Sequence, residues 1–255
     1  MRVAIITQED PFYLPKIFEY LLPKLKECDV QIVTTIVFSV SPFGVKKGKL
    51  EQLRDTLNTF GVSFTLYYTL KYLKSLFKKS LSETLFDYDI AVWHVHNSIN
   101  NQDNISKIKS LDLDLIISIA GNQIFKKQLI DSAKFGIINL HSALLPKYRG
   151  LMPSFWVLAN NEIETGVSVF FVDEGIDSGP VIVQKKIEIK NQTQEELIWQ
   201  LKYIGAVAIV EACVLVKQFG FNTPTSDNED EKMTYYSKPT SKDVQLFRSR
   251  GKRFF

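Results

Sequence analysis

Short apolar runs that alternate with longer stretches of helical apolar spacing constrain the fold of this chain most strongly. The runs lie at 3–7, 30–39, 90–95, 115–119 and 137–140. Between them, stretches such as 14–25 and 50–60 repeat apolar residues at helical spacing. Buried parallel strands show near-continuous apolar runs, and parallel neighbours need long crossover connections. The alternation therefore predicts an α/β fold, a mostly parallel sheet with helices on both faces.

The second half of the chain continues this pattern. Two further runs, 166–172 and 181–189, indicate strands, and 70–86 has the pattern of an additional basic helix. Thr193 is followed three residues later by Glu196, which is a capping-box spacing. This spacing predicts the start of a long helix.

The end of the chain differs in composition from the rest. Residues 227–231 are largely acidic, as in a solvated loop, and the residues after them mix aromatic and basic side chains. We therefore expect a main domain over 1–220. Residues 221–255 are expected to form a linker and a short C-terminal aromatic and basic tail.

The composition permits one sizeable globular unit. The chain has 255 residues, 45% of them hydrophobic, and a formal net charge of only +3, so a nucleic-acid partner is not expected. The longest apolar stretch, within 204–216, is interrupted by Glu211 and predicts no membrane segment. Cys28 and Cys213 lie far apart without metal-ligand spacing, which favours a cytoplasmic location and no metal site.

Three polar side chains give the clearest chemical signal. Asn139 and His141 lie two residues apart at the end of a strand-like run, so their side chains share one face. Asp177 lies in a glycine-containing turn after the run 166–172 and reaches His141 if the two strands are neighbours. A carboxylate beside an imidazole favours the protonated ring, and an amide can donate to an oxygen that becomes negative. The set predicts acyl transfer without a protein nucleophile.

These residues lie in two long motifs. Residues 139–150 read Asn-Leu-His-Ser-Ala-Leu-Leu-Pro-Lys-Tyr-Arg-Gly, and residues 173–180 read Asp-Glu-Gly-Ile-Asp-Ser-Gly-Pro. In both, the sequence resembles the N10-formyltetrahydrofolate-dependent formyltransferase superfamily. The resemblance is clearest over 110–190 and weaker over 1–220. It implies a Rossmann-like core, with 1–220 as the formyltransferase catalytic domain.

The same resemblance implies roles for individual residues. Asn139 would polarise the formyl oxygen, His141 would handle protons, and Asp177 would orient and charge-stabilise His141. The formyl donor would be N10-formyltetrahydrofolate, held by two loops at the carboxyl ends of strands. The residues implied to bind this cofactor are Gly121, Gln123, Ile124, Phe125, Val172, Asp173 and Gly175.

Departures from the family pattern bear on the amine acceptor. The glycine-rich phosphate loop of glycinamide ribonucleotide transformylases is replaced at 7–13 by acidic and aromatic residues. The stretch after Phe219 is too short for the C-terminal domain of methionyl-tRNA formyltransferases. We therefore expect a small-molecule amine, the amino group of a nucleotide-linked sugar. Candidate acceptor contacts are Phe12, Tyr13, Ser142 and Met152.

Other functions remain open on the same residues. They are a methionyl-tRNA formyltransferase-like activity, hydrolysis of the same donor, and a non-catalytic nucleotide-binding protein on the same core. The apolar segment 207–216 and the aromatic tail would allow a homodimer.

Two further pairs of residues favour structural roles. His94 and His96 share a strand face, but no cysteine or acidic cluster accompanies them, so a metal site is disfavoured. Lys147 and Arg149 could bind phosphate, yet in this motif a role in shaping the loop is favoured.

Overall fold

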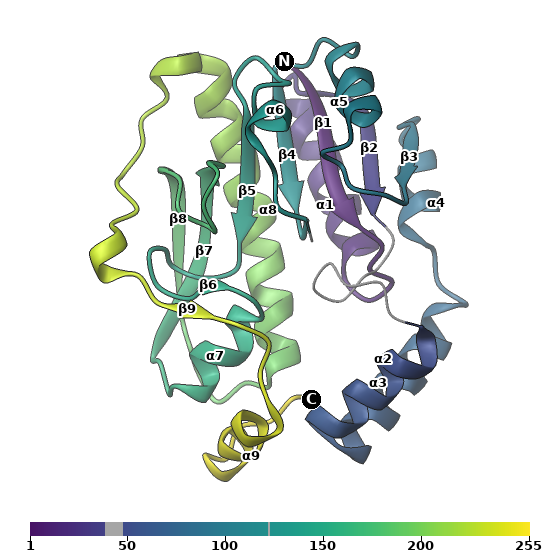
Figure 1. Ribbon diagram of the computed structural model, residues 1–255, viewed down its shortest axis with the longest axis vertical. Coiled ribbons are helices and arrows are strands. Elements are labelled where there is room, and N and C mark those ends of the chain that lie inside the picture. Colours follow the sequence, from purple (N-terminus) through teal and green to yellow (C-terminus); the bar gives the residue numbers. More distant parts are fainter. Residues whose placement is uncertain (39–47, 122) are drawn as a thin grey trace.

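The computed structural model describes residues 1–38, 48–121 and 123–255. Its strands are β1 (Arg2–Gln8), β2 (Gln31–Phe38), β3 (Val92–Val95), β4 (Leu115–Ile119), β5 (Ile137–His141), β6 (Arg149–Gly150), β7 (Glu164–Phe171), β8 (Val181–Glu188) and β9 (Tyr235–Tyr236). A seven-stranded sheet has the order β3-β2-β1-β4-β5-β7-β8 (Figure 1). The pairs from β3 to β5 are parallel, whereas β7 is antiparallel to both β5 and β8. The predicted mostly parallel sheet is confirmed.

Helices cover both faces of this sheet, as predicted. The helices of the described residues are α1 (Leu14–Glu27), α2 (Lys49–Phe60), α3 (Val62–Ser75), α4 (Leu81–Phe86), α5 (Gln102–Lys109), α6 (Lys127–Ile130), α7 (Pro153–Ala159), α8 (Gln194–Phe219) and α9 (Ser241–Ser249). Helices α1 and α8 share one apolar core with the sheet, and α5 and α6 share the other. The alternation along β1 explains the two cores, since Val3 and Ile5 face one and Ala4 and Ile6 the other.

The long helix α8 begins where its capping box predicts. The Glu196 N–H donates to the Thr193 hydroxyl over 3.2 Å, and the Thr193 N–H donates to the Glu196 carboxylate over 2.7 Å. Among the described residues, the segment Gln194–Asn222 is long and apolar enough to cross a membrane, and it extends beyond the apolar stretch 204–216. Its apolar residues pack against β7, β8 and α1. Gly205 faces Leu140 so closely that a Cβ there would lie 2.7 Å from the leucine side chain.

The predicted basic helix over 70–86 is divided in two. Its break coincides with Ser80, whose hydroxyl accepts from the Glu83 N–H over 3.1 Å and thereby starts α4. Upstream, the left-handed Gly61, with φ +83°, separates α2 from α3. Ser39, the last residue of the predicted second strand, lies outside the described residues.

The C-terminal segment 221–255 packs on the main part of the chain. Its strand β9 pairs in parallel with β6, and α9 buries Val244 and Phe247. The Phe247 ring stacks on Phe155 of α7 at a centroid distance of 4.9 Å. The division at residue 220 stays a prediction.

Strand β5, which carries Asn139 and His141, is paired with a strand on each side. In the register of β5, Asn139 pairs with Ser118 of β4, and His141 pairs with Ser168 of β7. The buried Ser168 hydroxyl accepts from the Leu145 N–H over 3.0 Å and donates to the Ala143 carbonyl over 2.7 Å. One side chain of β7 thus fixes the loop that follows His141.

We expect Ser168→Ala to lower the free energy of unfolding by about 1–3 kcal/mol, because a buried N–H and a buried carbonyl lose their partner. Urea unfolding followed by circular dichroism measures the change. The control is Ser142→Ala, since the half-buried Ser142 forms no side-chain hydrogen bond with the described residues. Equal effects of the two substitutions would contradict this account of the loop.

Candidate active site

Asn139 and His141 lie on one face at the carboxyl end of β5. The His141 side chain is 7% exposed, whereas Asn139 is half-buried. The side-chain amide of Asn139 forms no hydrogen bond with any of the described residues. An uncommitted amide at a strand end is free to donate to a bound molecule.

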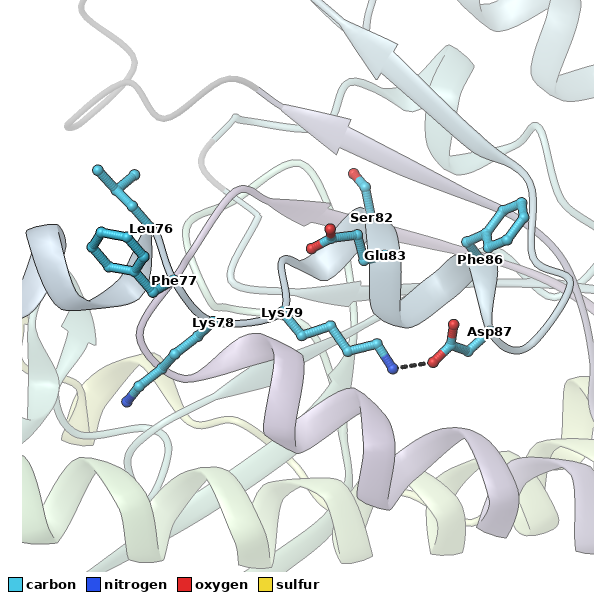
Figure 2. A pocket seen from close by; sticks show the side chains of 8 residues that line it. All are labelled: Leu76, Phe77, Lys78, Lys79, Ser82, Glu83, Phe86 and Asp87. Carbon is cyan, nitrogen blue, oxygen red and sulfur yellow. Dashed lines mark hydrogen bonds and ion pairs between the residues drawn. The ribbon is translucent and has the colours of Figure 1, made fainter.

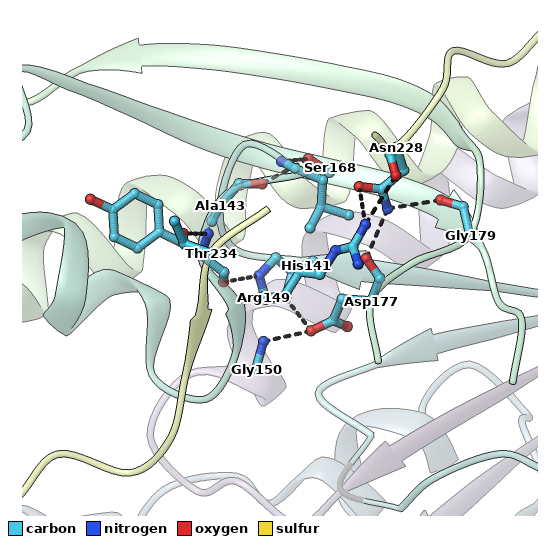
Figure 3. A network of polar contacts seen from close by, with 11 residues as sticks. His141, Ala143, Arg149, Gly150, Ser168, Asp177, Gly179, Asn228 and Thr234 are labelled. Atoms are coloured by element: carbon cyan, nitrogen blue, oxygen red, sulfur yellow. Dashed lines mark hydrogen bonds and ion pairs between the residues drawn. The ribbon is translucent and has the colours of Figure 1, made fainter. Parts of the chain in front are cut away.

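The two ring nitrogens of His141 have different surroundings. Nε2 lies 2.7 Å from the Tyr148 carbonyl oxygen. Because a carbonyl only accepts, Nε2 carries a hydrogen and donates it. Nδ1 lies 3.6 Å from Asp177 Oδ2, which is beyond a normal hydrogen bond but within ion-pair distance (Figure 3). The structure thus brings the three sequence-predicted catalytic residues to one strand end, with Nδ1 as the less committed nitrogen.

The turn that carries Asp177 fixes the carboxylate. Asp177 has φ +50°, in the left-handed region, and its side chain is 16% exposed. Its Oδ2 accepts the Gly150 N–H over 2.8 Å. The same oxygen therefore contacts the backbone of β6 and faces the imidazole of His141 (Figure 3).

Two site-lining residues were not predicted as such from the sequence. Arg149 is 4% exposed, and its guanidinium contacts Asp230 over 2.7 Å and Asn228 over 3.0 Å. Asn228 is buried, although 227–231 was expected to be a solvated loop; the acidic neighbours of Asn228 are exposed as expected. Arg149 itself could have indicated this contact, since an arginine among apolar residues is buried only when hydrogen-bonding or charged partners accompany it.

In the first predicted cofactor loop, after β4, some residues contact other parts of the protein and others are exposed. The Gln123 side chain accepts the Ile99 N–H over 2.8 Å and donates to the Asn97 carbonyl over 3.2 Å, so it joins two loops. Phe125 is buried in the core beside α5 and α6. Gly121 is exposed, and the Ile124 side chain is 67% exposed. Of these four predicted residues, Gly121 and Ile124 are the exposed ones.

The second predicted cofactor loop, after β7, is shaped by Asp173. Its Oδ1 accepts the Gly175 N–H over 3.0 Å and the Ser178 hydroxyl over 2.6 Å, which forms a local turn. Val172 is half-buried against the core, whereas Ile176 is 47% exposed. The turn therefore fixes the backbone and leaves an apolar side chain exposed.

Phe12 and Tyr13, two of the predicted acceptor contacts, pack within the protein. Tyr13 is buried, its ring lies edge-on to Trp199 at 5.0 Å, and its hydroxyl accepts from Lys71 over 3.2 Å. Burial raises the pKa of Tyr13 well above its ordinary value, so the phenol stays protonated. Phe12 contacts the Tyr68 ring at 5.9 Å. The structure does not bring this aromatic pair into contact with the His141 network.

Ser142 and Met152, the other two predicted acceptor contacts, lie closer in sequence to the site. Ser142 follows His141 directly and is half-buried. Met152 has φ +54°, precedes α7 and packs against the main core. Their roles stay predictions.

A hollow lies beside the Asp177 turn. It has a volume of about 570 Å³ and is lined by Ser178, Pro180, Asp227, Asn228, Glu229, Asp230 and Glu231. A second hollow of about 630 Å³ is formed by Leu76, Phe77, Lys78, Lys79, Ser82, Glu83, Phe86 and Asp87, where Lys79 pairs with Asp87 (Figure 2). This second hollow contains no candidate site residue.

The histidines outside the site form no metal cluster. His94 Nδ1 lies 3.8 Å from the Glu9 carboxylate. In the part of the chain that the structure describes, no group of three or more histidine, cysteine or acidic residues could hold a metal ion.

Similar solved structures share this architecture. Glycinamide ribonucleotide transformylase 1 from Symbiobacterium toebii superposes with a TM-score of 0.61 at 15% identity, covering 89% of this chain and 94% of that chain. The N-formyltransferase from Helicobacter canadensis, solved with folinic acid and dTDP-3-aminofucose, gives a TM-score of 0.58 at 19% identity, covering 96% and 78%. At these identities the likeness shows the fold.

Sequence relatives identify the family. The methionyl-tRNA formyltransferase of Clostridioides difficile (strain 630) is 34% identical over 163 residues, which are 64% of this chain and 52% of that protein. The enzyme of the same name from Thermodesulfovibrio yellowstonii is 40% identical over 121 residues, 47% of this chain and 39% of that protein. The chain spans about half the length of the curated relatives it matches. Because the formyl transferase family pattern matches residues 16–213, most of the chain, the protein belongs to that family.

Proposed function

We propose that this chain transfers a formyl group from N10-formyltetrahydrofolate to a primary amine, the amino group of a nucleotide-linked sugar. The observation that carries the proposal is the placement of Asn139, His141 and Asp177 around one strand end in a chain of the formyl transferase family. The setting proposed with it is the cytoplasm, in keeping with two free cysteines.

The edge of the sheet next to Asn139 fits a folate. Gly121 is constrained there, because a Cβ would lie 2.6 Å from the Ser118 hydroxyl. The Ser118 hydroxyl is buried and, within the described residues, has no hydrogen-bond partner. Exposed Ile124 and Ile176 provide apolar surface on the two predicted cofactor loops. A flat ring matches such apolar surface.

Each of the three proposed catalytic residues would have its own role in formyl transfer. Bound formyltetrahydrofolate supplies a carbonyl carbon activated for attack by an amine. The Asn139 amide donates to the oxygen on which negative charge develops. His141, with Nε2 held by the Tyr148 carbonyl, would take a proton from the attacking amine at Nδ1 and return it to the folate nitrogen, which leaves as its bond to the formyl carbon breaks. Asp177 fixes the ring from the Nδ1 side and stabilises its charged form.

Charge around the site supports a small amine as acceptor. The hollow beside Asp177 is lined by Asp227, Glu229, Asp230 and Glu231. Such an acidic rim attracts an ammonium group and repels the phosphates of RNA. A nucleotide-linked amino sugar would have to place its amine toward this rim and its phosphates away from it.

A second candidate is formylation of methionyl-tRNA. It is favoured by two relatives of that name, which are 34% identical to this chain over 163 residues and 40% identical over 121 residues. Hydrolysis of the donor and a binding role without catalysis use the same residues. A homodimer stays a prediction as well.

The acceptor is tested by mixing purified protein with N10-formyltetrahydrofolate and a panel of nucleotide-linked amino sugars. We expect mass spectrometry to show one sugar gaining a formyl group, with an equal amount of tetrahydrofolate formed. Methionyl-tRNA is the parallel arm, and formylation of the tRNA alone would reject the sugar. Donor loss without any acceptor would identify a hydrolase.

We expect Asn139→Ala and His141→Ala each to lower kcat by about 100- to 1000-fold, because each removes a group that meets developing charge or a moving proton. Asp177→Asn, which keeps the size but removes the charge, should also lower kcat. Steady-state kinetics on the best acceptor measures these effects. His94→Ala is the matched control, and its kcat should equal that of the unchanged chain; wild-type turnover by His141→Ala would contradict the proposed roles.

A further inference from the structure

The C-terminal segment crosses the candidate site although it lies outside the family match, which ends at residue 213. Ser226 exchanges two backbone hydrogen bonds with Val181, of 2.9 and 2.7 Å, and so starts the crossing at β8. Further along, β9 pairs with β6, next to the loop that carries Tyr148. Between these two anchors lies Asn228.

The side chain of Asn228 is buried and fully paired. Its Nδ2 donates to the carbonyls of Asp177, over 2.8 Å, and Gly179, over 3.0 Å. Its Oδ1 accepts from Arg149 Nη2 over 3.0 Å. Both donors therefore hold the Asp177 turn, and the acceptor holds the loop after His141 (Figure 3).

The two bonds to the turn act on the backbone of a residue in an unusual conformation. Asp177 has φ +50°, which a non-glycine residue keeps only when its surroundings fix it. Asn228 holds the Asp177 carbonyl, while the Asp177 carboxylate meets the Gly150 N–H and faces His141. Loss of the Asn228 bonds would free the carboxylate to turn away from the imidazole.

The loop on the other side of the imidazole depends on the same segment. The Arg149 N–H donates to the Thr234 carbonyl over 2.9 Å, and the Tyr148 N–H donates to the Thr234 hydroxyl over 2.8 Å. The Tyr148 carbonyl in turn accepts from His141 Nε2. Both partners of His141 are thus attached to residues 228–234.

We propose that Asn228 is a positioning residue of the catalytic site, which sets the Asp177 carboxylate against His141 through the two carbonyls it binds. The inference rests on the proposed formyl transfer. Asn228 touches neither His141 nor the reacting atoms, so it acts through Asp177.

Two substitutions separate positioning from packing. Asn228→Ala removes all three side-chain bonds. Asn228→Asp keeps the size and the acceptor for Arg149, and even adds charge attraction, but it replaces the two donors with a carboxylate oxygen facing two carbonyls. Asn222→Ala is the matched control, because Asn222 is an exposed asparagine just upstream whose side chain bonds no described residue.

If Asn228 positions Asp177, both Asn228 variants should lose about 10- to 100-fold in kcat, because small misplacements of catalytic groups cost that much. The KM for the folate donor should stay close to that of the unchanged chain, since the donor loops are not altered. The Asn222→Ala control should match the unchanged chain. Normal kcat in Asn228→Asp would overturn the proposal and leave only a packing role through Arg149.

A second measurement does not need turnover. In a ¹⁵N-histidine NMR spectrum, with the His141 signals assigned by comparison with His141→Gln, Asn228→Asp should shift the Nδ1 signal that faces Asp177. An unshifted signal would overturn the positioning role. A shifted signal in a chain that formylates no acceptor would support positioning and refute the proposed function, so the two failures are distinguishable.

Discussion

The Asp177 carboxylate is the contact on which the site depends. Its Oδ2 lies 2.8 Å from the Gly150 nitrogen and 3.6 Å from His141 Nδ1. The first contact fixes the acid on the strand β6, and the second gives the imidazole a charged neighbour with little solvent between them. Because ionic attraction strengthens as water is excluded, the burial of both side chains increases its effect. The sheet, the turn and the C-terminal segment all serve this arrangement.

Part of the backbone strain lies around the same place, although Asp29, Asp89, Asp112 and Asn161 have positive φ elsewhere. Tyr148, Met152 and Asp177 all have positive φ, as does Ala120 at the end of β4. Each non-glycine residue in this region destabilises the fold by on the order of 1 kcal/mol. Proteins keep such residues where a functional site needs that backbone geometry. Here they lie in the segments that lead into and out of the His141 network. The strain is sustained by hydrogen bonds with distant segments, such as the one that the Tyr148 N–H donates to the Thr234 hydroxyl.

The sequence predicted the features that depend on residues close together in the chain. Runs of apolar residues predicted the sheet because buried parallel strands need them, and Thr193 with Glu196 marked the start of α8. The motifs also indicated which side chains gather at the end of β5. The position of Asn228 could not be predicted, because its partners lie far from it in the chain and an asparagine among acids is typical of exposed loops. The packing of Phe12 and Tyr13 could not be predicted for a related reason, since it involves Tyr68 and Lys71 of α3 and Trp199 of α8; their role as acceptor contacts stays a prediction.

Helix α3 is attached to the rest of the molecule in an unusual way. None of its residues is buried, and Lys71 and Tyr67 join it to α8 through the carboxylate of Glu195, at 2.6 and 2.8 Å. Attachments of this kind weaken as ionic strength rises, whereas an apolar core does not. Aromatic contacts also hold the helix, since Phe64 packs against Phe254 at a centroid distance of 4.9 Å and Tyr67 stacks on Phe255 at 3.9 Å. Rising salt therefore weakens one part of the attachment and leaves the other. The part that salt weakens includes Lys71, whose ammonium group also donates to the hydroxyl of Tyr13.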